Sequence, residues 1–236
     1  MCLDCTAAAL SRRGFFGLAA AAGLGVGAAR ASASHGAKTE LTAGQAIERL
    51  KQGNARFVAD AQLCAADLGR RRGEVAAGQS PWATIVSCSD SRAPPELVFG
   101  GLGLGEVFVA RDAGAVVDAA ELGTLEYGAE ELGTPLIVVL GQQRCGAVSA
   151  ACEIVTRQAT FPGSIGAMVA PIVPAAEAVR QAPGDFVTNT VKESARRTAA
   201  GLTERSPLLA GLVREGRLSI VSAYYELDSG KVAFAA

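Results

Sequence analysis

Histidine, aromatic residues and net charge are all scarce in this chain. Its 236 residues include one histidine, aromatic residues make up 5%, and 22 basic residues nearly balance 23 acidic ones. This balance gives no basis for binding to nucleic acid or to an anionic membrane surface. After the N-terminal segment, no apolar stretch approaches the roughly 20 residues that a membrane-spanning helix needs. Because 50% of the residues are hydrophobic, the chain can still bury a full core, which indicates a soluble, enzyme-sized domain.

The first 33 residues have the pattern of an export signal. A twin-arginine pair at residues 12–13 precedes an apolar stretch over 18–29 and a small-residue cleavage site at 31–33. The alternative is an N-terminal core helix, which would be weakened by three glycines, Gly23, Gly25 and Gly27. We therefore predict a twin-arginine signal peptide over residues 1–33 and a mature domain over residues 34–236. The mature protein is expected to be periplasmic or secreted.

Four of the six cysteines lie in the predicted mature domain: Cys64, Cys88, Cys145 and Cys152. The other two would leave with the signal peptide. Export would place any suitably positioned pair in an oxidising compartment. On one helix the Cα atoms of Cys145 and Cys152 would lie roughly 10 Å apart, too far for a disulfide. We expect Cys64 and Cys152 to be packed, inert thiols.

The predicted mature chain alternates strand-like and helical segments. Strands are predicted over residues 83–86, 107–110, 136–140 and 218–223. Helices are predicted over 43–58, 95–99, 119–131, 147–155, 166–180, 185–202 and 207–214. The end of the chain, residues 225–234, has the pattern of a closing hairpin. Strands separated by helices form βαβ units, so we predict one α/β domain with a mostly parallel β-sheet flanked by helices.

Two cysteines lie just past predicted strands, Cys88 directly after one strand and Cys145 in the loop after another. Cys88 opens the motif Cys88-Ser89-Asp90-Ser91-Arg92, and Cys145 lies in Gly141-Gln142-Gln143-Arg144-Cys145-Gly146. Sites in open α/β sheets form beyond the carboxyl ends of the strands, so the two thiols are placed to converge at one edge. Two thiolates on Zn2+ leave room for one neutral ligand and one water or carboxylate. Without further similarity, two such cysteines are more often packed core than metal ligands.

Together the two motifs resemble the zinc-site motifs of the β-class carbonic anhydrases. The similarity runs from residue 50 to the end of the chain, through residues 50–57, 91–96, 111–114 and 221–225. Asp112 stands where the family usually has asparagine. The resemblance implies a zinc-dependent lyase that reversibly hydrates CO2 to bicarbonate, with Cys88 and Cys145 as zinc thiolates. It also implies a homodimer or larger homo-oligomer, with the helix over 43–58 packed on the partner.

The same resemblance makes Asp90 and Arg92 the dyad that gates the metal. An aspartate paired with an arginine stays ionised, and its free oxygen can accept a hydrogen bond from water on the metal. If the pair breaks, Asp90 can itself bind the metal and close the site. In an ordinary loop, an Asp-x-Arg sequence is a turn with a local ion pair.

The family's second motif has a histidine ligand where this chain has Gln142. A neutral imidazole is a good zinc ligand, whereas an amide oxygen is a hard and weak one. The single histidine, His35, would be the second residue of the mature chain. The candidates for the third ligand are Asp90, Gln142, a Glu or Asp elsewhere in the chain, and His35 if a flexible or partner-wrapping arm delivers it. Three functions stay open: a weakened carbonic anhydrase, an inactive scaffold or binding protein, and a hydrolase or lyase with altered metal use.

Overall fold

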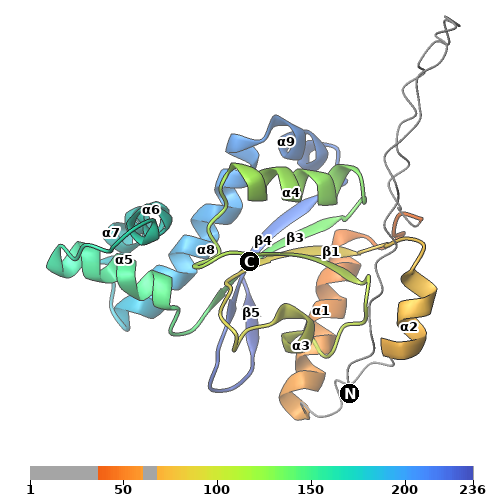
Figure 1. Cartoon of the computed structure of the whole chain (residues 1–236), viewed down its shortest axis with the longest axis horizontal. Helices are drawn as coiled ribbons and strands as arrows, with labels where there is room; N and C mark the ends of the chain where they lie inside the picture. The colour runs from red at the N-terminus through yellow and green to blue at the C-terminus, as the bar shows by residue number, and fades with distance from the viewer. Residues whose placement is uncertain (1–36, 61–67, 236) are drawn as a thin grey trace, which may run out of the picture. The chain divides into compact units, whose positions relative to one another are not determined.

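Helices and strands alternate along the chain as predicted (Figure 1). The computed structural model describes residues 37–60 and 68–235. The predicted signal peptide, His35 and Cys64 lie outside the described residues. Within the described part of the chain, no helix combines the length and apolar character needed to cross a bilayer.

A five-stranded sheet in the order β2-β1-β3-β4-β5 forms the centre of the fold. The strands are β1 (Ala83–Ser87), β2 (Val107–Arg111), β3 (Leu136–Gln142), β4 (Ser219–Tyr225) and β5 (Val232–Phe234). All neighbours pair in parallel except β4 and β5, which are antiparallel. β1 and β3 are buried at every position, as expected for strands covered on both faces. The predicted mostly parallel sheet is confirmed.

One face of the sheet is covered by α1 (Ala43–Ala59) and α3 (Pro95–Val98) (Figure 1). Leu50 of α1 is fully buried in the same core as Ile85 and Leu140 of the sheet. Ile47 and Phe57 pack against this core as partly buried side chains. The apolar face of α1 therefore packs on the sheet of its own chain.

The other face is covered by α4 (Ala119–Glu130), α8 (Phe186–Arg205) and α9 (Pro207–Arg214) (Figure 1). These helices contribute Leu125, Leu202 and Leu209 to a second core, and all three are fully buried. Alternate residues of β1 and β3 enter the two cores, because successive strand side chains point to opposite faces.

A third core forms where α5 (Gly146–Arg157) meets α7 (Val173–Val179) and α8, and it includes Cys88 and Cys145. The single helix predicted over residues 166–180 is wrong. That segment consists of α6 (Ile165–Val169), the 3-10 helix η2 (Ala170–Ile172) and α7. Pro171 and Pro174 lie at the starts of the last two pieces, and each lacks the N–H that would continue a helix.

Two further details differ from the sequence prediction. The first arm of the closing hairpin is the end of β4 itself, since Tyr225 pairs with Val232. The short helix α2 (Leu68–Val75) was not predicted. None of its residues is buried, so its sequence has no apolar periodicity to reveal it.

Candidate metal centre

The parallel pairing of β1 and β3 brings the two cysteine motifs together. Ser87 at the end of β1 lies opposite Leu140 of β3, so both following loops leave the same edge of the sheet. The Sγ atoms of Cys88 and Cys145 are 3.9 Å apart, and both residues are buried. Two thiolates on one tetrahedral zinc would lie about 3.8 Å apart. The predicted convergence of the thiols is therefore present, at a separation that suits a shared metal ion.

The loop that carries Cys88 is held by β2 and the residues after it. Arg111, the last residue of β2, donates from Nε to the Cys88 carbonyl at 2.9 Å and from Nη2 to the Asp90 carbonyl at 2.6 Å. The N–H of Gly114 donates to Cys88 Sγ at 3.2 Å. Gly114 has φ +83°, and a Cβ there would come within 2.6 Å of Ile172 Cδ1. The position thus needs glycine to bring its N–H to the sulfur.

Cys145 occupies the N-cap position of α5. The preceding residue, Arg144, has a left-handed backbone with φ 54°. Its guanidinium is held by both carboxylate oxygens of Asp228, at 2.9 and 2.7 Å. Arg92 donates to the Arg144 carbonyl at 3.3 Å, which links the two motif loops directly. The turn between β4 and β5 therefore helps to fix the loop that carries Cys145.

The two thiols titrate as a pair. The Cys145 thiol donates a hydrogen bond to Cys88, which lowers the pKa of Cys88 to about 5. The same hydrogen bond, together with burial, raises the pKa of Cys145. The pair therefore holds one proton between the two sulfurs and presents a thiolate at Cys88 near neutral pH.

Asp90 and Arg92 form the predicted dyad by a two-point contact. Arg92 Nε donates to Asp90 Oδ1 at 2.9 Å, and Arg92 Nη2 donates to Oδ2 at 2.6 Å. These hydrogen bonds lower the pKa of Asp90 to about 2, so the carboxylate is ionised at neutral pH. Both carboxylate oxygens therefore accept hydrogen bonds from the guanidinium of Arg92.

Gln142 is the last residue of β3 and only 2% exposed. Its side chain lies beside Cys88 and Asp90 and helps to lower the pKa of each. These are loose contacts, because Gln142 Nε2 makes no hydrogen bond of normal geometry to any described residue. A buried amide without a good partner is costly, and such groups point to a ligand or a functional role.

The donor set fits zinc only in part. Within residues 37–60 and 68–235, no cluster of three or more His, Cys, Asp or Glu side chains is placed to hold a metal ion. Cys88 and Cys145 supply two well-placed soft donors, while structural and catalytic zinc sites use at least three protein ligands.

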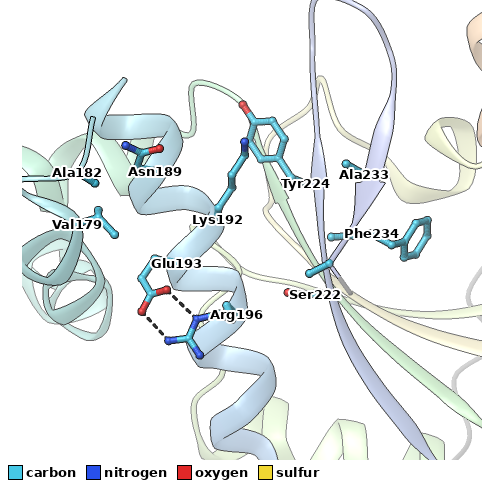
Figure 2. Close-up of a pocket in the computed structure, with 12 residues that line it drawn as sticks. Val179, Ala182, Asn189, Lys192, Glu193, Arg196, Ser222, Tyr224, Ala233 and Phe234 are labelled. Atoms are coloured by element: carbon cyan, nitrogen blue, oxygen red, sulfur yellow. Dashed lines mark hydrogen bonds and ion pairs between the residues drawn. The ribbon is translucent and has the colours of Figure 1, made fainter. Parts of the chain in front are cut away.

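A separate cavity of about 460 Å³ lies between α8 and the β4–β5 hairpin (Figure 2). Figure 2 shows Lys192 beside Tyr224, with the lysine Nζ 4.8 Å from the centre of the ring. Glu193 and Arg196 form an ion pair of 2.7 Å at its wall. Neither cysteine of the metal centre lines this cavity, so it is a distinct feature of the surface.

Solved structures with the same fold are β-carbonic anhydrases. A structure described as one of two tetrameric β-carbonic anhydrases from Sordaria macrospora matches with a TM-score of 0.62 at 20% identity, covering 82% of this chain and 98% of that one. The Coccomyxa β-carbonic anhydrase in complex with acetazolamide matches with a TM-score of 0.61 at 24% identity, covering 80% of this chain and 85% of that one. At these identities the likeness establishes the fold.

Sequence comparison establishes the family. The family model described as carbonic anhydrase matches residues 83–232. Carbonic anhydrase 2 of Mycobacterium tuberculosis is 38% identical over 187 residues, 79% of this chain and 89% of that protein. The chain belongs to the β-carbonic anhydrase family. A carbonic anhydrase of Mycolicibacterium smegmatis is 37% identical over 187 residues, with similar coverage of 79% and 90%. The predicted family and fold class are confirmed.

Three residues that shape this β-carbonic anhydrase site were not assigned a role from the sequence. Arg111 and Gly114 lie in a segment that resembles the family. Their contacts with the Cys88 loop, however, depend on the position of β2 beside β1. The sequence Asp228-Ser229-Gly230 predicted only a turn and gave Asp228 no role at the site. Its contact with Arg144 joins positions 84 residues apart and has no local signature.

Proposed function

We propose that this β-carbonic anhydrase hydrates CO2 reversibly to bicarbonate, at a low rate because its zinc site is incomplete. The observation that carries the proposal is the pair of thiols 3.9 Å apart beside the Asp90–Arg92 dyad, in a member of this family. Zinc, when bound to such a site, activates water as a nucleophile near neutral pH.

In this proposal each residue has a defined role. Cys88 and Cys145 hold the metal, and the N–H of Gly114 supports the thiolate of Cys88. Asp90, kept ionised by Arg92, provides an acceptor that orients a hydroxyl group at the site. Gln142 occupies the place of the family's histidine, where its amide is a poor substitute for imidazole.

The missing nitrogen ligand is the reason to expect slow catalysis. With two protein ligands, zinc is held more weakly than with two cysteines and one histidine. If Asp90 moved onto the metal to complete the set, it would occupy the position that water needs. Either arrangement lowers the fraction of protein that is ready to react.

A second candidate is a catalytically inactive relative that acts as a scaffold or binding protein. It is favoured by one observation: the described residues form no group of three or more His, Cys, Asp or Glu side chains that could hold a metal ion. This protein would keep the family fold and would not hydrate CO2 at any zinc concentration.

Stopped-flow CO2 hydration combined with elemental analysis separates the two candidates. We expect the purified protein to bind at most about one zinc per chain and to show slow hydration that depends on zinc. Cys88→Ser and Cys145→Ser should abolish both, while Cys152→Ser, a third buried thiol, should change neither. A kcat/KM of about 10⁷ M⁻¹s⁻¹ or above would contradict slow catalysis. Zinc content that survives both serine substitutions would contradict the assigned ligands.

We also propose that the protein is a homo-oligomer. The support is the Sordaria macrospora relative, whose structure is described as that of a tetrameric enzyme. Light scattering at micromolar concentration should give a mass of at least two chains. A monomer at that concentration would contradict the proposal.

Export by the twin-arginine route is a further proposal, supported by the sequence pattern of residues 1–33. In a host with this pathway, the exported protein should begin near Ser34 when its N-terminus is determined by mass spectrometry. Replacing both Arg12 and Arg13 by lysine should leave the protein uncleaved and inside the cell. Unchanged export of that variant would contradict this route.

A further inference from the structure

We propose that the Cys88–Cys145 pair is a binding site for copper(I) and takes this soft, monovalent ion in preference to zinc. The inference concerns which metal the site selects. It goes beyond the proposed CO2 hydration and does not depend on it.

The first argument is the type and number of the donors. Soft thiolate ligands select Cu(I), whereas zinc sites need three or four protein donors and accept nitrogen as well as sulfur. The described residues bring two sulfurs together and form no group of three or more His, Cys, Asp or Glu side chains placed to hold a metal ion. Copper(I) forms stable complexes with two thiolates alone, so this pair completes its coordination.

The second argument is that both cysteine side chains are buried and that hydrogen bonds hold the loop of Cys88. Cys88 is 6% exposed and Cys145 is 1% exposed. The N–H of Gly114 donates to Cys88 Sγ, and Cys145 lies at the N-cap position of α5. A separation of 3.9 Å between the sulfurs accommodates an ion bound in a bent two-coordinate arrangement. Zinc would instead need water or moving side chains to fill its remaining positions, and burial hinders both.

The third argument is that the neighbouring polar side chains add no further soft ligand. Both oxygens of Asp90 are held by Arg92, and releasing them would break a two-point ion pair. Gln142 lies beside Cys88 and Asp90, and its Nε2 makes no hydrogen bond to any described residue. Its only metal-donor atom is the amide oxygen, a hard ligand that suits copper(I) poorly. The groups around the pair thus support a two-sulfur site and do not extend it.

Anaerobic competition against a chromophoric copper(I) chelator, bicinchoninate, tests the proposal. All samples are the full chain with Cys2 and Cys5 replaced by serine, so that the N-terminal pair binds no metal. We expect the protein to remove about one copper(I) per chain from the chelator and to lose zinc to a zinc-chelating dye. Retention of zinc under conditions in which copper(I) is lost would overturn the proposal.

Matched variants identify the ligands. Cys88→Ser and Cys145→Ser should each lower the apparent copper(I) affinity on the order of 100-fold, whereas Cys152→Ser should leave it unchanged. His35→Ala and Cys64→Ser, which lie outside the described residues, should also leave it unchanged. A loss of copper(I) affinity in either of these two variants, or none in the Cys88 and Cys145 variants, would overturn the two-sulfur assignment.

Two further measurements test the copper(I) site without relying on cysteine variants that could fail to fold. X-ray absorption at the copper edge should show a first shell of sulfur without nitrogen or oxygen, and a nitrogen or oxygen ligand there would overturn the proposal. Gln142→His should raise zinc affinity on the order of 10- to 100-fold and leave copper(I) affinity nearly unchanged. Unchanged zinc affinity in this variant would show that the missing imidazole does not decide the selectivity.

Discussion

The Sγ atoms of Cys88 and Cys145 lie 3.9 Å apart although the two residues are 57 positions apart in the chain. Parallel pairing of β1 with β3 creates this closeness, and Gly114 and Arg111 hold the first loop in place. The sulfurs of a disulfide are about 2.05 Å apart, so a small movement of either loop would allow a bond. The separation that suits a metal ion also makes the metal-free pair sensitive to oxidation.

We predict that metal-free protein forms a Cys88–Cys145 disulfide when treated with oxidised glutathione, and that bound metal slows the reaction. Formation of the disulfide transfers two electrons and two thiol protons from the cysteines to oxidised glutathione. The oxidant is thereby reduced to two glutathione molecules. Mass spectrometry of non-reduced peptides should identify the cross-link. Cys152→Ser should react in the same way, since Cys152 contacts Thr190 instead of either site cysteine. Finding both cysteines free after prolonged exposure to the oxidant would contradict the prediction.

Gln142→His should increase both zinc content and CO2 hydration. An imidazole at this buried strand end supplies the nitrogen ligand that the site lacks. Changes to the groups that only support metal ligands already alter metal affinity by roughly 10- to 100-fold, so a direct ligand should have at least this effect. Elemental analysis and stopped-flow hydration check the result. Gln181→His, at an exposed position, is the matched control and should change neither quantity. If Gln142→His binds zinc fully and hydration stays absent, the inactive alternative is correct.

Arg92→Ala should raise the pKa of Asp90 from about 2 towards its ordinary value near 3.9. A carboxyl with a lowered pKa stabilises the fold above its unfolded pKa, and this stabilisation is lost as pH falls through the folded value. Arg92 is half exposed, so solvent screens the ion pair and we expect only a small loss of stability at pH 7.

Urea unfolding of the Arg92→Ala protein at several pH values, with NMR titration of the Asp90 carboxyl, checks this expectation. The difference from the unmodified protein should shrink between pH 4 and pH 2. Arg180→Ala, at an exposed position, is the control and should leave the Asp90 titration unchanged. An Asp90 pKa that stays near 2 without Arg92 would contradict the assigned cause.

Glu121→Gln should stabilise the protein at alkaline pH. Burial and the nearby Asp112 and Asp118 raise the pKa of Glu121 to about 7, and its buried Oε2 has no hydrogen-bond partner among the described residues. Because the folded pKa is above the unfolded one, ionisation destabilises the fold increasingly from about pH 4.5 to pH 7.

We expect Glu121→Gln to gain about 1 kcal/mol at pH 8, after discounting for partial exposure, and little at pH 4.5. Urea unfolding at the two pH values measures the difference. Glu204→Gln, on the exposed side of α8, is the control and should show no such pH dependence. An equal effect of Glu121→Gln at both pH values would contradict the raised pKa.

Asn54→Ala should destabilise the fold strongly. Asn54 Nδ2 donates to the carbonyls of Val98 and Gly230 at 3.0 and 2.8 Å, and its Oδ1 accepts from the Val232 N–H at 2.9 Å. These bonds join α1 to α3 and to the β4–β5 hairpin, and their loss leaves buried backbone groups unpaired. We expect a loss of about 2–4 kcal/mol in urea unfolding.

Asn189→Ala is the matched control for Asn54→Ala, because Asn189 makes one hydrogen bond to the Pro183 carbonyl near the surface. It should cost less than about 1 kcal/mol. Equal losses in the two variants would contradict the assigned role of Asn54.

The β-carbonic anhydrase family and the positions of the site cysteines were determined by local sequence. Cys88 directly follows an apolar strand, and Cys145 lies in the loop after another. The carboxyl ends of parallel strands lie at the same edge of a sheet. The dyad of Asp90 and Arg92 was also predictable, since the two residues are neighbours in one loop. Helical periodicity of apolar residues was sufficient to predict α1, and short apolar runs rich in β-branched residues were sufficient for the parallel strands.

Only the tertiary structure decided how this site is held and what surrounds it. Contacts such as Gly114 to Cys88 and Arg144 to Asp228 join residues far apart in sequence. They depend on strand order and register, which local patterns do not encode. The identity of Gln142 could be read directly, but its burial and its unpaired amide could not. Those features arise because β3 is covered on both faces, which places the side chain at its end inside the protein beside the two sulfurs.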